Sequence, residues 1–178
     1  MAASRALAGL KEKGYKTSVD VVSEEGDRYR KVILPCLKYT DYLIINEVEA
    51  GNCLGMSLRD AQGHITFSAA EAAARELLAL GVNDLVVIHF PEGGVAVSAD
   101  GRSAVRASES PDPSQIVSTV GAGDAFCAGV LYSIHEGFDL DRMLLFANTS
   151  ARFNLFSATS TGGAPTLKQV EEYMKTRI

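Results

Sequence analysis

The sequence STVGAGDA, residues 118–125, carries the strongest signal of fold and function in this chain. It places Gly121, Gly123 and Asp124 at the start of a predicted helix. The first backbone N–H groups of a helix lack partners within the helix and carry the positive end of its dipole, so they bind phosphate well. Glycines let the backbone approach such an anion without an intervening side chain. Beside a bound anion, Asp124 would handle a proton or a metal ion.

These residues also fit a purely structural explanation. The helix dipole favours an aspartate in the first turn, and the glycines before it can simply form a turn. The short motif leaves both explanations open. The longer stretch IVSTVGAGDAFCAGV, residues 116–130, strongly resembles the C-terminal signature of the ribokinase-like (PfkB) carbohydrate kinases.

The resemblance implies transfer of the γ-phosphoryl group of ATP to an alcohol, with a sugar or a related small molecule as the acceptor. In that family the aspartate of GAGD is the catalytic base, and the backbone before it forms an anion hole. Carried over, Asp124 is the base, and Gly121, Ala122 and Gly123 form the hole. The family often has aspartate where this chain has Ser118, a difference that bears on a monovalent-cation site rather than on catalysis.

The composition is typical of a globular protein. The 178 residues are 47% hydrophobic and 22% charged, which predicts one domain over residues 1–178 with a substantial core. A net charge of −5 without a Lys/Arg cluster argues against nucleic-acid binding. No apolar run approaches the ~20 residues that cross a bilayer, and the N-terminal sequence lacks a signal core. Scattered cysteines without metal-ligand spacing predict buried free thiols in a cytoplasmic protein (Cys36, Cys53 and Cys127).

Predicted helices and strands alternate along the chain, which predicts an α/β fold with a mainly parallel sheet. Ser68 is expected to cap the clearest helix, and Gly81 to end it. With the family resemblance, the expected architecture is a ribokinase-like three-layer sandwich. Helices are expected over 2–13, 27–38, 68–80, 140–156 and 166–175, strands over 16–22, 42–45 and 85–90, and a hairpin from 94–98 and 103–107.

The sequence Asn46-Glu47-Val48-Glu49 follows the strand that ends at Ile45. Ligands of such sheets bind beyond the carboxyl ends of the strands. Asn with Glu three residues later is also a capping box, which serves the helix alone. The resemblance implies more, because the family has an N-x-x-E motif here that orders Mg²⁺ and the ATP phosphates. Carried over, Asn46 contacts phosphate, and Glu49 holds Mg²⁺ through water, which this ion tolerates.

The sequence HFPEGG, residues 89–94, occupies the place of the family's T-x-G-x-x-G nucleotide loop. Gly94 alone aligns cleanly and is predicted to bind nucleotide. Proline replaces the first glycine and removes a backbone donor. His89 replaces the threonine and is as compatible with a satisfied strand-end histidine as with a phosphate contact. Asp20 is a weaker candidate, because Val22 replaces the asparagine of the family's Asp-x-Asn pattern.

Two further segments are assigned through the resemblance. Asn148 matches a position at which the family often contacts adenine, although a capping or solvated asparagine is equally compatible. The loop SATSTGGA, residues 157–164, is expected to wall the adenine pocket and to offer carbonyl oxygens to a potassium-like ion.

The resemblance covers nearly all of the chain, yet members of the family are usually much longer. We therefore expect a fragment of a larger kinase, or a shortened protein without the N-terminal part and the lid. A shortened sheet would expose an unpaired edge, which predicts self-association into a homo-oligomer. Two functions remain open: an ATP-dependent carbohydrate kinase, or an inactive nucleotide-binding module that lacks the sugar site. An NAD-binding domain fits less well, because no G-x-G-x-x-G follows the first clear strand.

Overall fold

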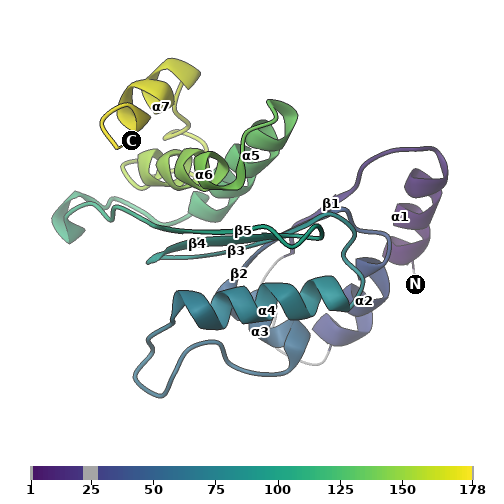
Figure 1. Cartoon of the computed structure of the whole chain (residues 1–178). Coiled ribbons are helices and arrows are strands. Elements are labelled where there is room, and N and C mark those ends of the chain that lie inside the picture. Colours follow the sequence, from purple (N-terminus) through teal and green to yellow (C-terminus); the bar gives the residue numbers. More distant parts are fainter. Residues whose placement is uncertain (1, 22–27, 178) are drawn as a thin grey trace. The chain divides into compact units, whose positions relative to one another are not determined.

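The computed structural model describes residues 2–21 and 28–177. Within these residues, five strands form one sheet in the order β1-β2-β3-β4-β5 (Figure 1). The strands are β1 (Ser18–Val19), β2 (Tyr42–Asn46), β3 (Leu85–Phe90), β4 (Gly93–Ser98) and β5 (Ser103–Ala107). The helices are α1 (Ala2–Glu12), α2 (Arg28–Leu37), α3 (Glu47–Leu54), α4 (Phe67–Ala79), the 3₁₀ helix η1 (Pro113–Gln115), α5 (Ala122–His135), α6 (Leu140–Asn154) and α7 (Leu167–Met174).

The sheet is mixed. β1 and β2 run parallel, with Ser18 opposite Tyr42. The helices α3 and α4 lie between β2 and β3 in the chain and supply a crossover long enough for a parallel neighbour. The connections from β3 to β4 and from β4 to β5 are far too short for such a crossover, so these strands form antiparallel hairpins. The predicted α/β class and the predicted hairpin are confirmed.

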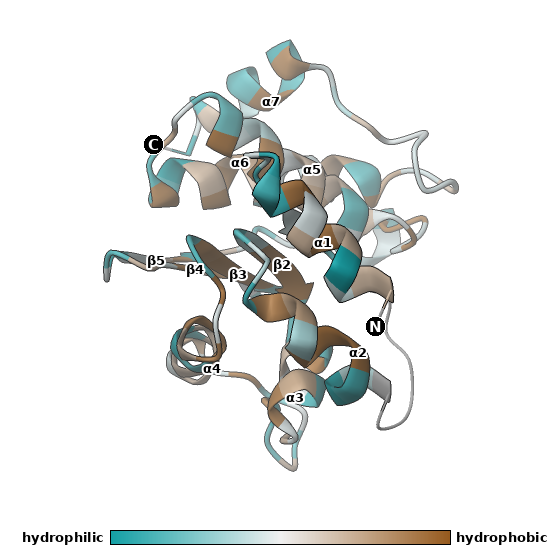
Figure 2. Cartoon of the chain, turned by 90° about the vertical axis from the view of Figure 1, so that its right-hand side faces the viewer, coloured by the Kyte–Doolittle hydropathy of each residue, from teal (hydrophilic) through white to brown (hydrophobic). Residues whose placement is uncertain are grey.

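The chain divides into two compact units, which are described separately. Unit 1 comprises Met1–Ile88 and Val95–Ser103, and unit 2 comprises His89–Gly94 and Ala104–Ile178. In unit 1, α3 and α4 lie on the same face of β2 (Figures 1 and 2). In unit 2, α5 packs closely on α6, and α7 packs on α6. The single domain over residues 1–178 stays a prediction.

The middle strands form the core of the sheet, as their continuous apolar sequences predict. Leu43, Ile44 and Ile45 of β2 are completely buried, and so are Val86, Val87 and Ile88 of β3. Figure 2 shows these strands as mostly hydrophobic. A run of consecutive buried residues is expected where both faces of a strand are covered. The edge strand β5 instead alternates exposed and half-buried residues. Self-association through an unpaired edge of a shortened sheet stays a prediction.

The boundaries of several elements differ from the sequence expectation. The helix predicted over 68–80 begins at Phe67, and Thr66, not Ser68, is its cap. Thr66 has extended backbone dihedrals, and its side chain accepts a hydrogen bond from the Ala69 amide, whereas Ser68 already lies inside the helix. Among the described residues of the strand expected over 16–22, only Ser18–Val19 pairs. Residues 22 and 27, at the ends of two predicted elements, lie outside the described residues.

The cysteines do not form disulfides with one another: Cys36 and Cys53 are buried, as predicted, whereas Cys127 is half-buried and not buried as predicted. Burial raises the pKa of the Cys53 thiol to about 11, so this side chain is a poor nucleophile. The described residues contain no group of three His, Cys, Asp or Glu side chains that could hold a metal ion. In the same part of the chain, none of the helices has the length and apolarity to cross a bilayer.

Candidate active site

The GAGD sequence forms a tight turn that leads directly into α5 in unit 2. Gly121 is the residue before the helix and has left-handed dihedrals, with φ at 82°. As a glycine, it makes no capping hydrogen bond through a side chain. Within the described residues, the amides of Gly121, Gly123 and Asp124 donate no hydrogen bond, whereas the Ala122 amide donates to the Thr119 carbonyl at 3.2 Å. Three unused donors therefore coincide with the positive end of the α5 dipole, which is favourable for an anion.

Asp124 is the third residue of α5 and is exposed. Its carboxylate makes no hydrogen bond or ion pair with any residue that the structure describes. The side chain is therefore available to a ligand at the same helix start. This arrangement fits the catalytic role expected of Asp124, which stays a prediction together with the anion hole of Gly121, Ala122 and Gly123.

The loop over residues 157–164 packs so closely on residue 121 that only glycine fits there. A Cβ added to Gly121 would lie 2.4 Å from the Ser160 carbonyl oxygen and 2.7 Å from the Ser160 Cα. Both are backbone atoms, so a small rotation of a side chain cannot relieve the clash. The positive φ of Gly121 excludes other residues independently. The structure thus places this loop directly against the GAGD turn, within unit 2.

His89, at the end of β3, lies beneath the start of α5. Its ring stacks on Phe126 with centroids 4.8 Å apart. A Cβ added to Gly123 would lie 3.4 Å from the His89 Cε1 atom, so the imidazole reaches the backbone of the turn. Burial lowers the pKa of His89 to about 4, which keeps the ring uncharged at neutral pH. The structure therefore brings His89 to the candidate anion site as a neutral group.

The lowered pKa of His89 predicts a loss of stability in mild acid. Between about pH 4 and pH 6.5, the unfolded chain binds a proton at this residue that the folded chain does not bind. The free energy of unfolding should therefore fall as the pH drops through this window, by roughly 2–3 kcal/mol at pH 4.5. Urea unfolding at pH 7 and pH 4.5 measures the difference. His89→Gln should remove this part of the pH dependence, and an unchanged dependence would contradict a neutral His89 with a lowered pKa.

Gly94 is explained by packing. It is buried at the start of β4, and a Cβ there would lie 3.2 Å from both the Leu144 Cδ2 and the Phe126 Cζ atoms. These side chains belong to α6 and α5, so the glycine permits both helices to approach the strand within unit 2. Its predicted contact with nucleotide stays a prediction.

Asn46 and Glu49 form a complete capping box in unit 1. The Asn46 side chain accepts a hydrogen bond from the Glu49 amide, and the Glu49 carboxylate accepts one from the Asn46 amide, both at 2.9 Å. Only 4% of the Glu49 surface is exposed. The structural explanation for this motif is therefore confirmed. Binding of Mg²⁺ or phosphate by these residues is compatible with the cap and stays a prediction.

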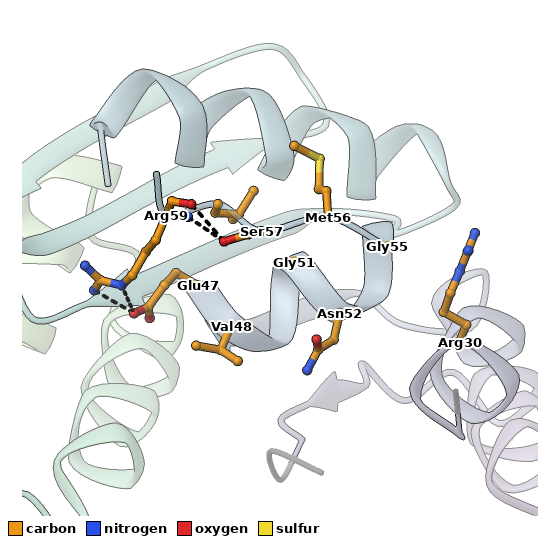
Figure 3. Close-up of a pocket in the computed structure, with 10 residues that line it drawn as sticks. Arg30, Glu47, Val48, Gly51, Asn52, Gly55, Met56, Ser57 and Arg59 are labelled. Carbon is orange, nitrogen blue, oxygen red and sulfur yellow. Dashed lines mark hydrogen bonds and ion pairs between the residues drawn. The ribbon is translucent and has the colours of Figure 1, made fainter. Parts of the chain in front are cut away.

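A pocket of about 560 Å³ lies beside α3 in unit 1 (Figure 3). At one end the Glu47 carboxylate accepts hydrogen bonds from the Arg59 guanidinium, at 2.6 and 2.9 Å. Val48 and Met56, which also line the pocket, are more than half exposed. No sequence pattern indicated this pocket. Arg59 lies in a loop, twelve residues after Glu47 in the chain, and that spacing does not indicate that the two residues pair. Asn46 and Glu49 do not line it.

The predicted adenine contacts fall into two separate pockets of unit 2. The Asn148 Nδ2 atom donates to the Arg106 carbonyl at 3.4 Å, and Asn148 lines a pocket of about 210 Å³. The loop over residues 157–164 instead contributes to a pocket of about 480 Å³, together with Phe153 and Phe156. The structure therefore places the loop beside the GAGD turn but does not bring it into one pocket with Asn148. Asp20 is exposed in unit 1, where its carboxylate accepts from the Val21 amide.

The sequence comparisons agree on one family. The family model described as pfkB family carbohydrate kinase matches residues 2–167. A 5-dehydro-2-deoxygluconokinase of Clostridium botulinum (strain Alaska E43 / Type E3) is 30% identical over 105 residues, which cover 59% of this chain and 30% of that protein. A ribokinase of Bacillus subtilis (strain 168) is 35% identical over 104 residues, which cover 58% of this chain and 34% of that protein. The chain therefore matches only about a third of the length of these relatives.

Solved structures confirm the ribokinase-like α/β fold. Arabidopsis thaliana ribokinase, complexed with ribose and ATP, has a TM-score of 0.79 at 22% identity, over 98% of this chain and 52% of its own. A ribokinase II from E. coli, described as in complex with ATP and Mg²⁺, has a TM-score of 0.75 at 21% identity, over 98% and 53%. Escherichia coli phosphofructokinase-2, in complex with potassium, has a TM-score of 0.75 at 17% identity, over 99% and 52%. The chain spans about half the length of these structures.

Proposed function

Because this chain belongs to the PfkB family of carbohydrate kinases, we propose that it transfers the γ-phosphoryl group of ATP to a sugar hydroxyl, alone or as the catalytic part of a longer kinase. The observation that carries this proposal is the start of α5. Three unused backbone amides and an exposed, unpaired carboxylate occur there within four residues, among the residues that the structure describes. An anion and an acceptor hydroxyl can be held side by side at such a helix start.

Phosphoryl transfer proceeds through a loose transition state, so catalysis depends on positioning and on neutralising charge. The amides of Gly121, Gly123 and Asp124 stabilise the negative oxygens of the transferring group. The Asp124 carboxylate orients the sugar hydroxyl and accepts its proton as the new oxygen–phosphorus bond forms. The bond between the γ-phosphorus and the bridging oxygen of ADP breaks in the same step.

Mg²⁺ is part of the proposal, with Glu49 as its protein contact. The ion accepts carboxylate oxygens and commonly keeps waters between itself and the protein. Glu49 fits this role, because its carboxylate is held in place by the Asn46 amide at a carboxyl end of the sheet. When bound, Mg²⁺ would neutralise charge on the phosphates. The carbonyl oxygens of residues 157–164 are the corresponding candidates for a monovalent cation.

Glu49→Gln is expected to raise the Mg²⁺ concentration that supports half-maximal ATP binding by about tenfold or more. Glutamine keeps the capping box, because its side-chain oxygen still accepts from the Asn46 amide. The variant therefore loses the negative charge of residue 49 but keeps the stability of the helix. A Mg²⁺ titration of ATP binding measures the effect of the lost charge. Glu47→Gln, on the same helix turn, is the matched control and should leave the Mg²⁺ dependence unchanged. If the Glu49 variant had the same Mg²⁺ dependence as the wild type, capping of α3 would be the only role left for Glu49.

The second candidate function is a nucleotide-binding module without kinase activity. The short span of the chain relative to its relatives favours it, because a sugar site can lie in the part that is not matched. Release of ADP from Mg-ATP, measured with a panel of sugars, separates the two functions. ADP release that depends on one sugar supports the kinase. Binding of Mg-ATP without release supports the module, and the absence of binding contradicts both.

A further inference from the structure

The buried side chain of Asn154 is tied to the GAGD turn. Asn154 is the last residue of α6, and only 1% of its surface is exposed. Its Nδ2 atom donates a hydrogen bond to the Val120 carbonyl oxygen at 2.9 Å. Val120 is 63% exposed, so packing of its side chain does little to hold the residue in place. The hydrogen bond from Asn154 therefore restrains the carbonyl of the peptide that precedes Gly121, while the Val120 amide donates to the Ser118 Oγ atom at 3.1 Å.

This hydrogen bond fixes the direction of an amide that the proposed mechanism uses. The Val120 carbonyl and the Gly121 N–H belong to the same peptide group, which is planar and trans. In a trans peptide the two bonds point in opposite directions. When Asn154 holds the carbonyl on one side, the Gly121 N–H must point to the other side. Gly121 is one of the three residues at this helix start whose amides have no partner in the described part of the chain.

Asn154 itself is poorly explained by stability. Its Oδ1 atom is the one buried side-chain nitrogen or oxygen, among the residues described, that lacks a hydrogen-bond partner. Burying an acceptor without a partner costs stability and offsets part of what the hydrogen bond from Nδ2 contributes. A residue that only filled this space would be better replaced by leucine. Residues that lower stability locally are expected where they serve a site.

The surroundings of Asn154 leave little freedom for it to move. A Cβ added to Gly163 would lie 2.6 Å from the Asn154 Cα, so the loop over residues 157–164 packs directly on this position. The same loop contacts Gly121 through Ser160. The next residue, Leu155, accepts a hydrogen bond from the Val117 amide at 2.9 Å, in the segment that leads into the turn. Asn154 therefore lies where α6, the loop and the GAGD turn meet within unit 2.

We propose that Asn154 is a positioning residue that aims the Gly121 amide at the phosphoryl group. The inference rests on the proposed function, because it assigns Asn154 to the same phosphate-binding turn. Its side chain would act through the Val120 carbonyl and would not touch the nucleotide. The assignment predicts that replacing the amide side chain by an apolar one weakens nucleotide binding far more than it changes stability.

The test uses Asn154→Leu in the full chain. The melting temperature should change little, because the variant loses both the unpaired Oδ1 atom and the hydrogen bond to the Val120 carbonyl, while the affinity for Mg-ATP falls by about tenfold or more, the loss expected when a hydrogen bond to a charged group is misaligned. The amide NMR signal of Gly121 should shift in the variant without nucleotide. Ser133→Ala is the matched control, because it removes another buried polar group, a hydroxyl that donates to the Gly129 carbonyl within α5. It should leave both the Gly121 signal and the affinity unchanged.

Asn154→Asp provides a second variant of nearly the same shape. At a pH at which the new carboxyl group is ionised, it cannot donate to the Val120 carbonyl, so it should also shift the Gly121 signal and weaken Mg-ATP binding. An unshifted Gly121 signal in both folded variants, or wild-type affinity for Mg-ATP in both, would overturn the inference. Failure of the wild-type protein to bind Mg-ATP would instead contradict the proposed function, and the Gly121 signal would still report whether Asn154 holds the turn.

Discussion

Asp124→Asn is expected to lower the rate of sugar phosphorylation by about 10²- to 10⁴-fold, the range typical for loss of a general base. Asparagine has nearly the same shape and can still accept a hydrogen bond, but it cannot take the proton of the sugar hydroxyl. The affinity for Mg-ATP should change little, because the amides that bind phosphate remain. Steady-state kinetics with the accepted sugar, combined with calorimetric titration of Mg-ATP, separate the two effects.

Asp139→Asn is the matched control for this variant. Asp139 is also an acidic residue at a helix start, where its side chain accepts from the Arg142 amide, and asparagine caps a helix equally well. Its turnover should equal that of the wild type. If the Asp124 variant turned over substrate at the wild-type rate, Asp124 would not act as the catalytic base.

Gly121→Ala is expected to have the largest effect on the integrity of the site. Alanine disfavours the observed φ of 82°, and its Cβ would lie 2.4 Å from the Ser160 carbonyl oxygen. The backbone of the turn or of the loop must therefore move, at a cost of about 1–3 kcal/mol for the conformational strain, and more for the clash. Because the amides that bind phosphate belong to the displaced turn, the affinity for Mg-ATP should also be lost. Urea unfolding and calorimetry measure the two effects.

Gly63→Ala separates the clash from the strain. Gly63 has the same φ of 82°, but a Cβ there would meet no atom within 4 Å. This variant should lose only the stability that the unfavourable dihedral angle costs, and it should bind Mg-ATP like the wild type. If both variants lost the same free energy of unfolding and both kept Mg-ATP binding, close packing of the loop on the GAGD turn would be contradicted.

Local patterns in the sequence predicted most of the fold, because they depend on neighbouring residues. The apolar run at residues 85–90 and the Asp-Gly turn at residues 100–101 correspond to β3 and to the β4–β5 hairpin. The spacing of Asn46 and Glu49 predicted the capping box that the structure contains. The cap of α4 was assigned to Ser68 instead of Thr66, because two competent caps lie two residues apart and only the backbone dihedrals distinguish them.

Contacts between distant residues could not be predicted in this way. Asn154 and Val120 are 34 residues apart, and no spacing in the sequence indicates their hydrogen bond. The ion pair between Lys11 and the buried Asp41 likewise requires α1 and β2 to be placed first. The GAGD turn was identified from its residues, whereas the loop that excludes a side chain at Gly121 became evident only in the structure. The motif thus located the candidate site, whereas the contacts that hold the GAGD turn in place could be identified only from the structure.

The claim that backbone amides at the start of α5 bind the transferable phosphoryl group is tested most directly by amide NMR. Titration with Mg-ATP should shift the signals of Gly121, Gly123 and Asp124 and slow their exchange with solvent. The Gly101 amide of the β4–β5 hairpin, already bonded to the Ser98 carbonyl, should not respond. Saturating binding of Mg-ATP that leaves the three amide signals of the turn in place would contradict the account.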